Sequence, residues 1–249
     1  EPEDFRPQRP ELNFVPASSG AGVGFTQSPV ELPVNVVPSS RHAMNTVDNA
    51  AVERVIHDSI SVKQAIVEDA ELVGAIVRVT NRVVACLKAG NKVLIAGNGG
   101  SAADAQHIAA EFVSRFEFDR PGLPALALTT DTSALTAIGN DYGYEQIFSR
   151  QVQALARPQD LFIGISTSGN SANILRAVQV CREMQVFSVA LCGNKGKLPA
   201  LCDDVIAVPS AHTPRIQEAH SLIGHIICGL AEEAIWGQQY KPKAAPESH

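Results

Sequence analysis

Two turns rich in glycine and hydroxyl side chains are the residues best suited to bind an anion. The first turn is Gly97-Asn98-Gly99-Gly100-Ser101, after the apolar run 93–96, and the second is Ser166-Thr167-Ser168-Gly169-Asn170-Ser171, after the apolar run 161–165. Backbone N–H groups in such turns can approach an anion, hydroxyl groups add donors, and a following helix directs its positive end inward. The two turns therefore predict a phosphate site.

The first turn does not have the pattern of a nucleotide site. It lacks the lysine of the P-loop and the third glycine of the dinucleotide fingerprint. A phosphorylated small molecule is therefore the favoured ligand. The alternative is that both are ordinary turns of an α/β sheet, but two of them in one chain favour a ligand, because such sheets bind ligands where their strands end.

His107 and Glu111 lie four residues apart, shortly after the first turn. On a helix this spacing stacks an imidazole and a carboxylate on one face. The pair could bind a metal ion, or Glu111 could act as a general base. The plain alternative is a hydrogen-bonded pair on the protein surface.

The last long helical pattern, 213–236, holds several polar residues among apolar ones: Arg215, Gln217, Glu218, His220 and His225. Taken alone, His225 is readily explained as a core histidine bonded to a carbonyl. Gln217 and His225 lie eight residues apart, a rise of about 12 Å along a straight helix. Spacing therefore gives no reason to pair them as ligands of one metal ion.

The stretch Gly139-Asn140-Asp141-Tyr142-Gly143 is expected to break a helix. Its Asn140 and Asp141 suit either a tight turn or contacts with the hydroxyl groups of a polyol. Asp131 could also contact a polyol, or it could cap a helix that begins near Thr132.

Strands alternate with helices along the rest of the chain, which predicts an α/β fold with a doubly wound, parallel, five-stranded sheet. Two helices within 52–89 precede the sheet, and Gly90 is placed to end the second. The expected order after them is strand 93–97, helix 102–116, strand 125–129, helix 132–139, helix 144–155, strand 160–166, helix 171–184, strand 186–192, helix 197–201, strand 204–208 and helix 213–236.

Composition predicts a soluble globular protein with one folded domain over 44–240. Residues 1–43 hold seven of the fifteen prolines and show no periodicity, so we expect a disordered extension there, with Met44 as an alternative start. The tail 241–249 is also expected to be disordered.

Charge and hydropathy argue against binding to nucleic acid and to a membrane, and cysteine usage indicates the redox environment. The net charge of −6 argues against direct nucleic-acid binding, which needs a basic face. No apolar run approaches the length of a membrane span, and no secretory signal is present, so a cytoplasmic location is expected. The five cysteines form no CxxC pair, which indicates reduced core thiols.

These motifs together give the core, from about Val52 to Trp236, a close resemblance to the phosphosugar-binding SIS domain, and within it to the sedoheptulose 7-phosphate isomerases, also called phosphoheptose isomerases. The resemblance is carried by GNGGS at 97–101, DAQHIAAE at 104–111, RPG at 120–122, GNDYG at 139–143, GISTSGNS at 164–171, and RIQE at 215–218 with His225.

The resemblance implies a role for each matching residue. The sugar phosphate would be held by residues of both turns, with further substrate contacts from the helices and the loop between them: Asn98, Gly99, Gly100, Ser101, Ser166, Thr167, Ser168, Ser171, Asn140, Asp141, Glu111 and Gln217. One zinc ion per subunit would be bound by His107, Glu111, Gln217 and His225.

The implied reaction is an aldose–ketose isomerisation in a homotetramer, with the N-terminal helices packed against partner subunits. Glu111 would remove the proton next to the carbonyl of open-chain sedoheptulose 7-phosphate, and His225 would move a proton between oxygens of an enediol. The product would be D-glycero-D-manno-heptose 7-phosphate, in the first step of nucleotide-activated heptose biosynthesis.

Two other functions compete with the enzyme. Some SIS-domain relatives are non-enzymatic, including a replication-initiator-binding protein, and a sugar-phosphate sensor would also need only the two turns. The presence of Glu111, Gln217 and His225 favours the enzyme. Ala102 and Pro214 stand where some relatives have polar residues, which leaves substrate orientation and anomeric preference open.

Overall fold

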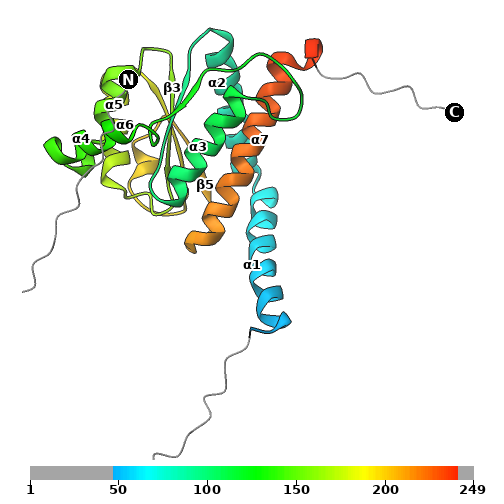
Figure 1. Ribbon diagram of the computed structural model, residues 1–249. Coiled ribbons are helices and arrows are strands. Elements are labelled where there is room, and N and C mark those ends of the chain that lie inside the picture. Colours follow the sequence, from blue (N-terminus) through cyan, green and yellow to red (C-terminus); the bar gives the residue numbers. More distant parts are fainter. Residues whose placement is uncertain (1–46, 241–249) are drawn as a thin grey trace, which may run out of the picture. The chain divides into compact units, whose positions relative to one another are not determined.

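The computed structural model describes residues 47–240 (Figure 1). The predicted extension over 1–43, the alternative start at Met44 and the predicted tail over 241–249 therefore lie outside the described residues. None of the helices in the described part combines the length and apolarity that crossing a membrane requires.

The predicted parallel sheet is confirmed. Five strands pair in the order β2-β1-β3-β4-β5, and every pairing is parallel. The strands are β1 (Val93–Ala96), β2 (Ala125–Ala127), β3 (Leu161–Ser166), β4 (Phe187–Gly193) and β5 (Asp204–Val208).

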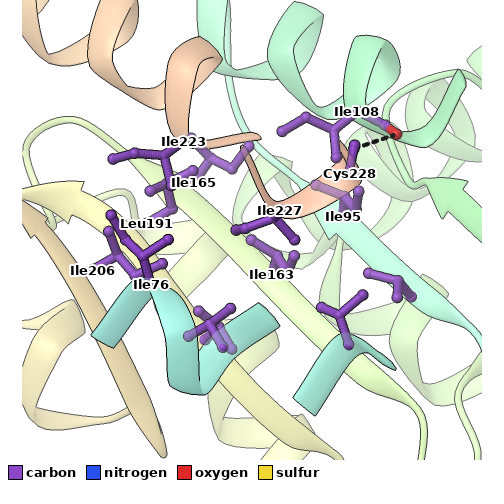
Figure 2. Close-up of a cluster of buried hydrophobic side chains, with 14 of the residues drawn as sticks. Ile76, Ile95, Ile108, Ile163, Ile165, Leu191, Ile206, Ile223, Ile227 and Cys228 are labelled. Carbon is purple, nitrogen blue, oxygen red and sulfur yellow. Dashed lines mark hydrogen bonds between the residues drawn. The ribbon is translucent and has the colours of Figure 1, made fainter. Parts of the chain in front are cut away.

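Helices cover both faces of the sheet, because the side chains of each inner strand alternate between two apolar cores. One core joins residues such as Ile95 and Ile163 to helices α2 (Ala70–Lys88), α3 (Gly100–Val113) and α7 (Thr213–Tyr240). Figure 2 shows Ile223 and Ile227 of α7 within this core. The other core joins residues such as Leu94 and Phe162 to α4 (Thr132–Tyr142), α5 (Ser149–Leu155) and α6 (Ala172–Glu183).

The N-terminal region forms two helices, as predicted. The first is α1 (Asn49–Glu68), and α2 follows it after Asp69, whose carboxylate accepts a hydrogen bond from the Leu72 N–H. Gly90 adopts φ +78° just beyond the end of α2 and donates to the carbonyl of Leu87. Glycine is favoured at this position because it tolerates the left-handed conformation.

The helices expected over 102–116 and 213–236 span Gly100–Val113 and Thr213–Tyr240 instead. Three other helix predictions also differ from the structure. The helix expected to stop at 139 continues to Tyr142, because Gly139 fits inside α4 and the chain turns only at Gly143, with φ +91°. The expected helix 144–155 splits into the short 3₁₀ turn η1 (Tyr144–Gln146) and α5, and the expected helix 197–201 is the 3₁₀ turn η2 (Leu198–Ala200). The predicted cap is confirmed, since Asp131 accepts from the Ala134 N–H at 2.9 Å.

Strand order brings the two predicted turns together. From β1 the chain passes through α3 to β2, whereas from β3 it passes through α6 to β4 on the other side. Because β1 and β3 are neighbours, their carboxyl ends form a topological switch point, where sheets of this kind bind ligands. The first turn follows β1 and the second follows β3.

The buried side chain of His220 is expected to make the stability of this fold depend on pH. The His220 side chain on α7 is 0% exposed. Burial lowers its pKa from 6.5 to about 4, and the backbone of Cys192 opposes this only in part.

We expect the protein to lose stability as the pH falls from about 6.5 to about 4, because His220 binds a proton more readily in the unfolded chain. Its contribution is complete above the unfolded pKa and declines by up to about 3 kcal/mol as the pH falls through the folded value. Urea unfolding at about pH 7.5 and about pH 5 measures the loss. The variant His220→Leu should show a flatter dependence, and an equal slope in both proteins would contradict the assignment.

Candidate functional site

Helices α3 and α7 run side by side in the same direction. Residue numbers rise on both helices from one contact to the next. Gln217 lies against Gly100 at the start of α3. Farther along, the Ser221 hydroxyl donates to Asp104 at 2.7 Å, and Gly224 faces Ile108. A Cβ atom at position 224 would lie 2.7 Å from the Ile108 side chain, so a larger residue there would require that side chain to shift. The alignment places the next residue, His225, beside His107.

Three polar side chains meet at this contact. The Nε2 atom of His107 lies 2.7 Å from Nε2 of His225 and 3.3 Å from a carboxylate oxygen of Glu111. One ligand atom from each residue lies within 4.8 Å of the others. The contact between His107 and Glu111 confirms that they share one helix face. The proximity of His225, 118 residues from His107, depends on the packing of α7.

This His107–Glu111–His225 cluster has the chemistry of a metal site. Two imidazole nitrogens and a carboxylate oxygen are ligands that Zn²⁺ accepts, and a catalytic site with three protein ligands keeps a position for substrate. The side chains are also reachable, since those of His107 and Glu111 are 53% and 23% exposed. An open hollow lined by Phe116, Leu230 and others adjoins His225.

Gln217, the fourth predicted ligand, contacts a different part of α3. Its amide nitrogen is packed against Gly100, where a Cβ atom would lie 2.4 Å away. Gly100 precedes His107 by seven residues, about 10 Å along the helix. At this position Gln217 is better placed to contact the substrate than to bind a metal ion beside His107 of the same chain. Its role as a metal ligand stays a prediction.

The first turn exposes backbone donors at the start of α3. Gly99 adopts φ +56° at the N-cap and offers no side chain to the first N–H groups of the helix. Helix N-termini left without a side-chain cap are suited to anions. Ser101 is buried within the first helical turn.

The second turn is held in shape by its surroundings. The hydroxyls of Ser166 and Ser171 lie 2.8 Å apart, and Ser171 stands at the N-cap of α6 without capping it. Gly169 has φ +63° and packs against the carbonyl of Lys195, 2.3 Å from where a Cβ atom would lie. The hydroxyl of Ser168 accepts from a backbone N–H within the turn.

An amide pair connects the two turns, which together we call the cradle. Asn98 and Asn173 exchange two side-chain hydrogen bonds, of 2.9 and 2.8 Å. The hydroxyl of Tyr144 also donates to the Asn98 oxygen at 2.9 Å. Much of the Asn98 side chain is thus engaged within the protein.

The sequence did not identify Asn173 or Tyr144 as site residues, although Asn173 follows the second turn by only two residues.

Asn140 and Asp141 are exposed in the last turn of α4, where the Asn140 amide donates to Asp141 at 2.8 Å. They lie shortly before Tyr144, which reaches the cradle. Their predicted contact with substrate, like that of Thr167, stays a prediction.

Asp104 is a further candidate that the sequence reasoning did not select. It lies on α3 between the cradle and His107, and one of its carboxylate oxygens is buried with no hydrogen-bond partner among residues 47–240. Burial raises the pKa of Asp104, while the Ser221 hydroxyl and His107 oppose the rise. Asp104 therefore places one further polar side chain on α3 between the cradle and the cluster.

Comparisons with known proteins agree with these features. The SIS domain family matches residues 57–193. The chain is 60% identical over 193 residues to a phosphoheptose isomerase of Aneurinibacillus thermoaerophilus, covering 77% of this chain and 98% of that protein.

Two solved phosphoheptose isomerases share the fold. The structure from Francisella tularensis has a TM-score of 0.72 and 38% identity, covering 76% of this chain and 100% of that one. The structure of GmhA from Neisseria gonorrhoeae has a TM-score of 0.69 and 45% identity, covering 74% and 98%.

We expect Gly97→Ala to weaken phosphate binding by at least about 10-fold. The added Cβ atom would lie 2.4 Å from the carbonyl oxygen of Ser101, so the first turn would have to shift. Calorimetric titration with inorganic phosphate measures the loss. Gly74→Ala is the matched control, because its Cβ atom would meet only the end of the Arg78 side chain, at 3.6 Å. Unchanged affinity in Gly97→Ala would rule out the cradle.

Proposed function

The chain belongs to the SIS-domain phosphoheptose isomerases, and we propose that the cradle and the His107–Glu111–His225 cluster are the two halves of its active site. The enzyme isomerises sedoheptulose 7-phosphate to D-glycero-D-manno-heptose 7-phosphate, in the biosynthesis of heptose. Its relatedness to isomerases favours this function over the binding-protein and sensor alternatives.

The main support for this proposal is the closeness of the Glu111 and His225 side chains at the α3–α7 contact, where their ligand atoms lie within 4.8 Å of each other. Aldose–ketose isomerisation needs one group to take the proton beside the carbonyl and another to move a proton between two oxygens. We assign the first task to the Glu111 carboxylate and the second to the His225 imidazole. General acid–base catalysis by such a pair contributes about 10²- to 10⁴-fold in rate.

The proposed substrate position follows the direction of α3. The phosphate would accept hydrogen bonds at the cradle, from the backbone of Gly99 and Gly100 and the hydroxyls of Ser101, Ser166, Thr167, Ser168 and Ser171. His107 follows Ser101 by six residues, about 9 Å along the helix. Because an open-chain heptose phosphate has its phosphate and its carbonyl at opposite ends, its reacting carbons would lie beside the cluster. Asn98, Asn140, Asp141 and Gln217 would position the chain between them.

We also propose that the cluster holds one zinc ion per subunit, with His107, Glu111 and His225 as its ligands; Gln217, which lies against Gly100 in this structure, would contact the substrate. The donor types and their convergence support this assignment. When bound, zinc would stabilise negative charge that develops on the sugar oxygens.

The proposed assembly is a homotetramer in the cytoplasm. Val52, Val55, Ile56 and Ile60 recur at helical spacing on α1, and each is at least 50% exposed. A stripe of this kind is typical of a helix that packs against another chain. All five cysteines are unpaired, as expected in a reducing compartment.

We expect Glu111→Gln to lower kcat by about 10²- to 10⁴-fold and to leave inorganic phosphate affinity unchanged, because the amide cannot accept the proton. The assay follows formation of the aldose phosphate from sedoheptulose 7-phosphate by the zinc-loaded protein. Glu183→Gln, which alters an exposed carboxylate at the end of α6, is the control and should retain full activity. Retained turnover in Glu111→Gln would exclude Glu111 as the base.

Removal of metal by a chelator should abolish most of the activity, and Zn²⁺ should restore it while Mg²⁺ should not, because imidazole ligands favour zinc. Metal analysis should give one zinc per chain in the wild type and less in His107→Ala. Full activity in protein shown to be metal-free would refute the zinc assignment.

A further inference from the structure

A buried ion pair lies beyond the cluster, at the end of α3. Arg120, in the segment after α3, contacts Glu232 of α7 at 2.9 Å, and their side chains are 1% and 0% exposed. Burying two charges is costly, and apolar residues of similar volume often stabilise a protein as well. The pair therefore calls for an explanation besides stability.

Glu232 fixes the chain that leaves α3. Its carboxylate accepts from the backbone N–H groups of Phe116 at 2.8 Å and Glu117 at 2.7 Å, as well as from Arg120. Burial alone would raise the pKa of Glu232, but these hydrogen bonds outweigh it and hold the pKa below its usual value. A group on α7 thus anchors the segment that follows α3.

Arg120 fixes the last turn of α3 itself. Its guanidinium donates to the carbonyl of Glu111 at 2.9 Å and to that of Phe112 at 2.6 Å. Carbonyls in the last turn of a helix lack partners within the helix. The backbone of the proposed catalytic base is thereby tied to Glu232, on the helix that carries His225.

Phe116 extends the same network to the second catalytic group. Its ring lies 5.4 Å from the His225 ring, centroid to centroid. It fits there because position 229 is glycine, where a Cβ atom would lie 3.1 Å from the Phe116 ring. Since Glu232 holds the Phe116 backbone, it also sets the ring that packs against His225.

We propose that Arg120 and Glu232 are positioning residues that hold Glu111 and His225 in register for the isomerisation. This inference rests on the proposed function of the cluster. The pair touches neither the cradle nor the cluster side chains, so it acts through the backbone of Glu111 and the ring of Phe116. Its loss should therefore affect catalysis and leave phosphate binding intact.

A second ion pair in the same chain provides a matched control. Asp160 accepts from two backbone N–H groups and one cation, as Glu232 does: the Lys92 N–H, the Arg157 N–H and the Lys92 ammonium. Its side chain is 2% exposed, and it lies at the amino ends of β1 and β3, away from the proposed site. Asp160→Asn should lower stability as Glu232→Gln does, with no specific effect on catalysis.

The experiment compares Glu232→Gln, Arg120→Lys and Asp160→Asn with the wild type, all as folded, zinc-loaded protein below their melting temperatures. We expect Glu232→Gln and Arg120→Lys to lower kcat by about 10- to 100-fold, with KM and inorganic phosphate affinity within about twofold. Zn²⁺ affinity, measured by calorimetry on the metal-free proteins, should fall by about 10-fold or more in both variants. Asp160→Asn should match the wild type in all of these values.

Two outcomes would overturn the proposal. If kcat and Zn²⁺ affinity in Glu232→Gln and Arg120→Lys equal those of Asp160→Asn, the pair serves stability alone. If KM or phosphate affinity changes while kcat does not, the pair supports binding instead. A wild-type protein that forms no aldose phosphate would refute the proposed function itself, and Zn²⁺ affinity would still report whether the pair orders the cluster.

Discussion

The close parallel contact between α3 and α7 is the constraint on which the rest of the site depends. Gly224 lets α7 approach Ile108, and at this distance His225 meets His107 and Glu111. A side chain at position 224 would have to displace the Ile108 side chain at this contact. Because the three polar groups come from segments 118 residues apart, no local structure could assemble them.

The sheet supplies the other half of the arrangement. Opposite crossovers from β1 and β3 place two uncapped helix starts at one switch point, and the Asn98–Asn173 pair connects them. The cradle and the cluster are then joined by a single rigid element, α3, which begins at one and carries His107 and Glu111 at the other. In the proposed active site, α3 would therefore set the separation between the bound phosphate and the reacting carbonyl.

Local features were predictable from sequence, and those that depend on tertiary packing were not. Helical spacing gave the His107–Glu111 contact, and the strand pattern gave the parallel sheet, because each depends on neighbours in the chain. The end of α4 was predicted wrongly at Gly139, since the structure needs the left-handed conformation only at Gly143. His225 was assigned to the site only through the resemblance to the family. Neither spacing nor composition predicted the ion pair between Arg120 and Glu232. The packing of α3 against α7 determines both the His225–His107 contact and this ion pair.

A crystal structure of Glu111→Gln with sedoheptulose 7-phosphate bound would test the proposed active site most directly. We expect the phosphate to lie between the first and second turns, with the carbonyl end of the open chain beside His225 and the amide that replaces the Glu111 carboxylate. A phosphate in the cradle with the carbonyl end far from both groups, in every copy of the chain, would contradict this proposal.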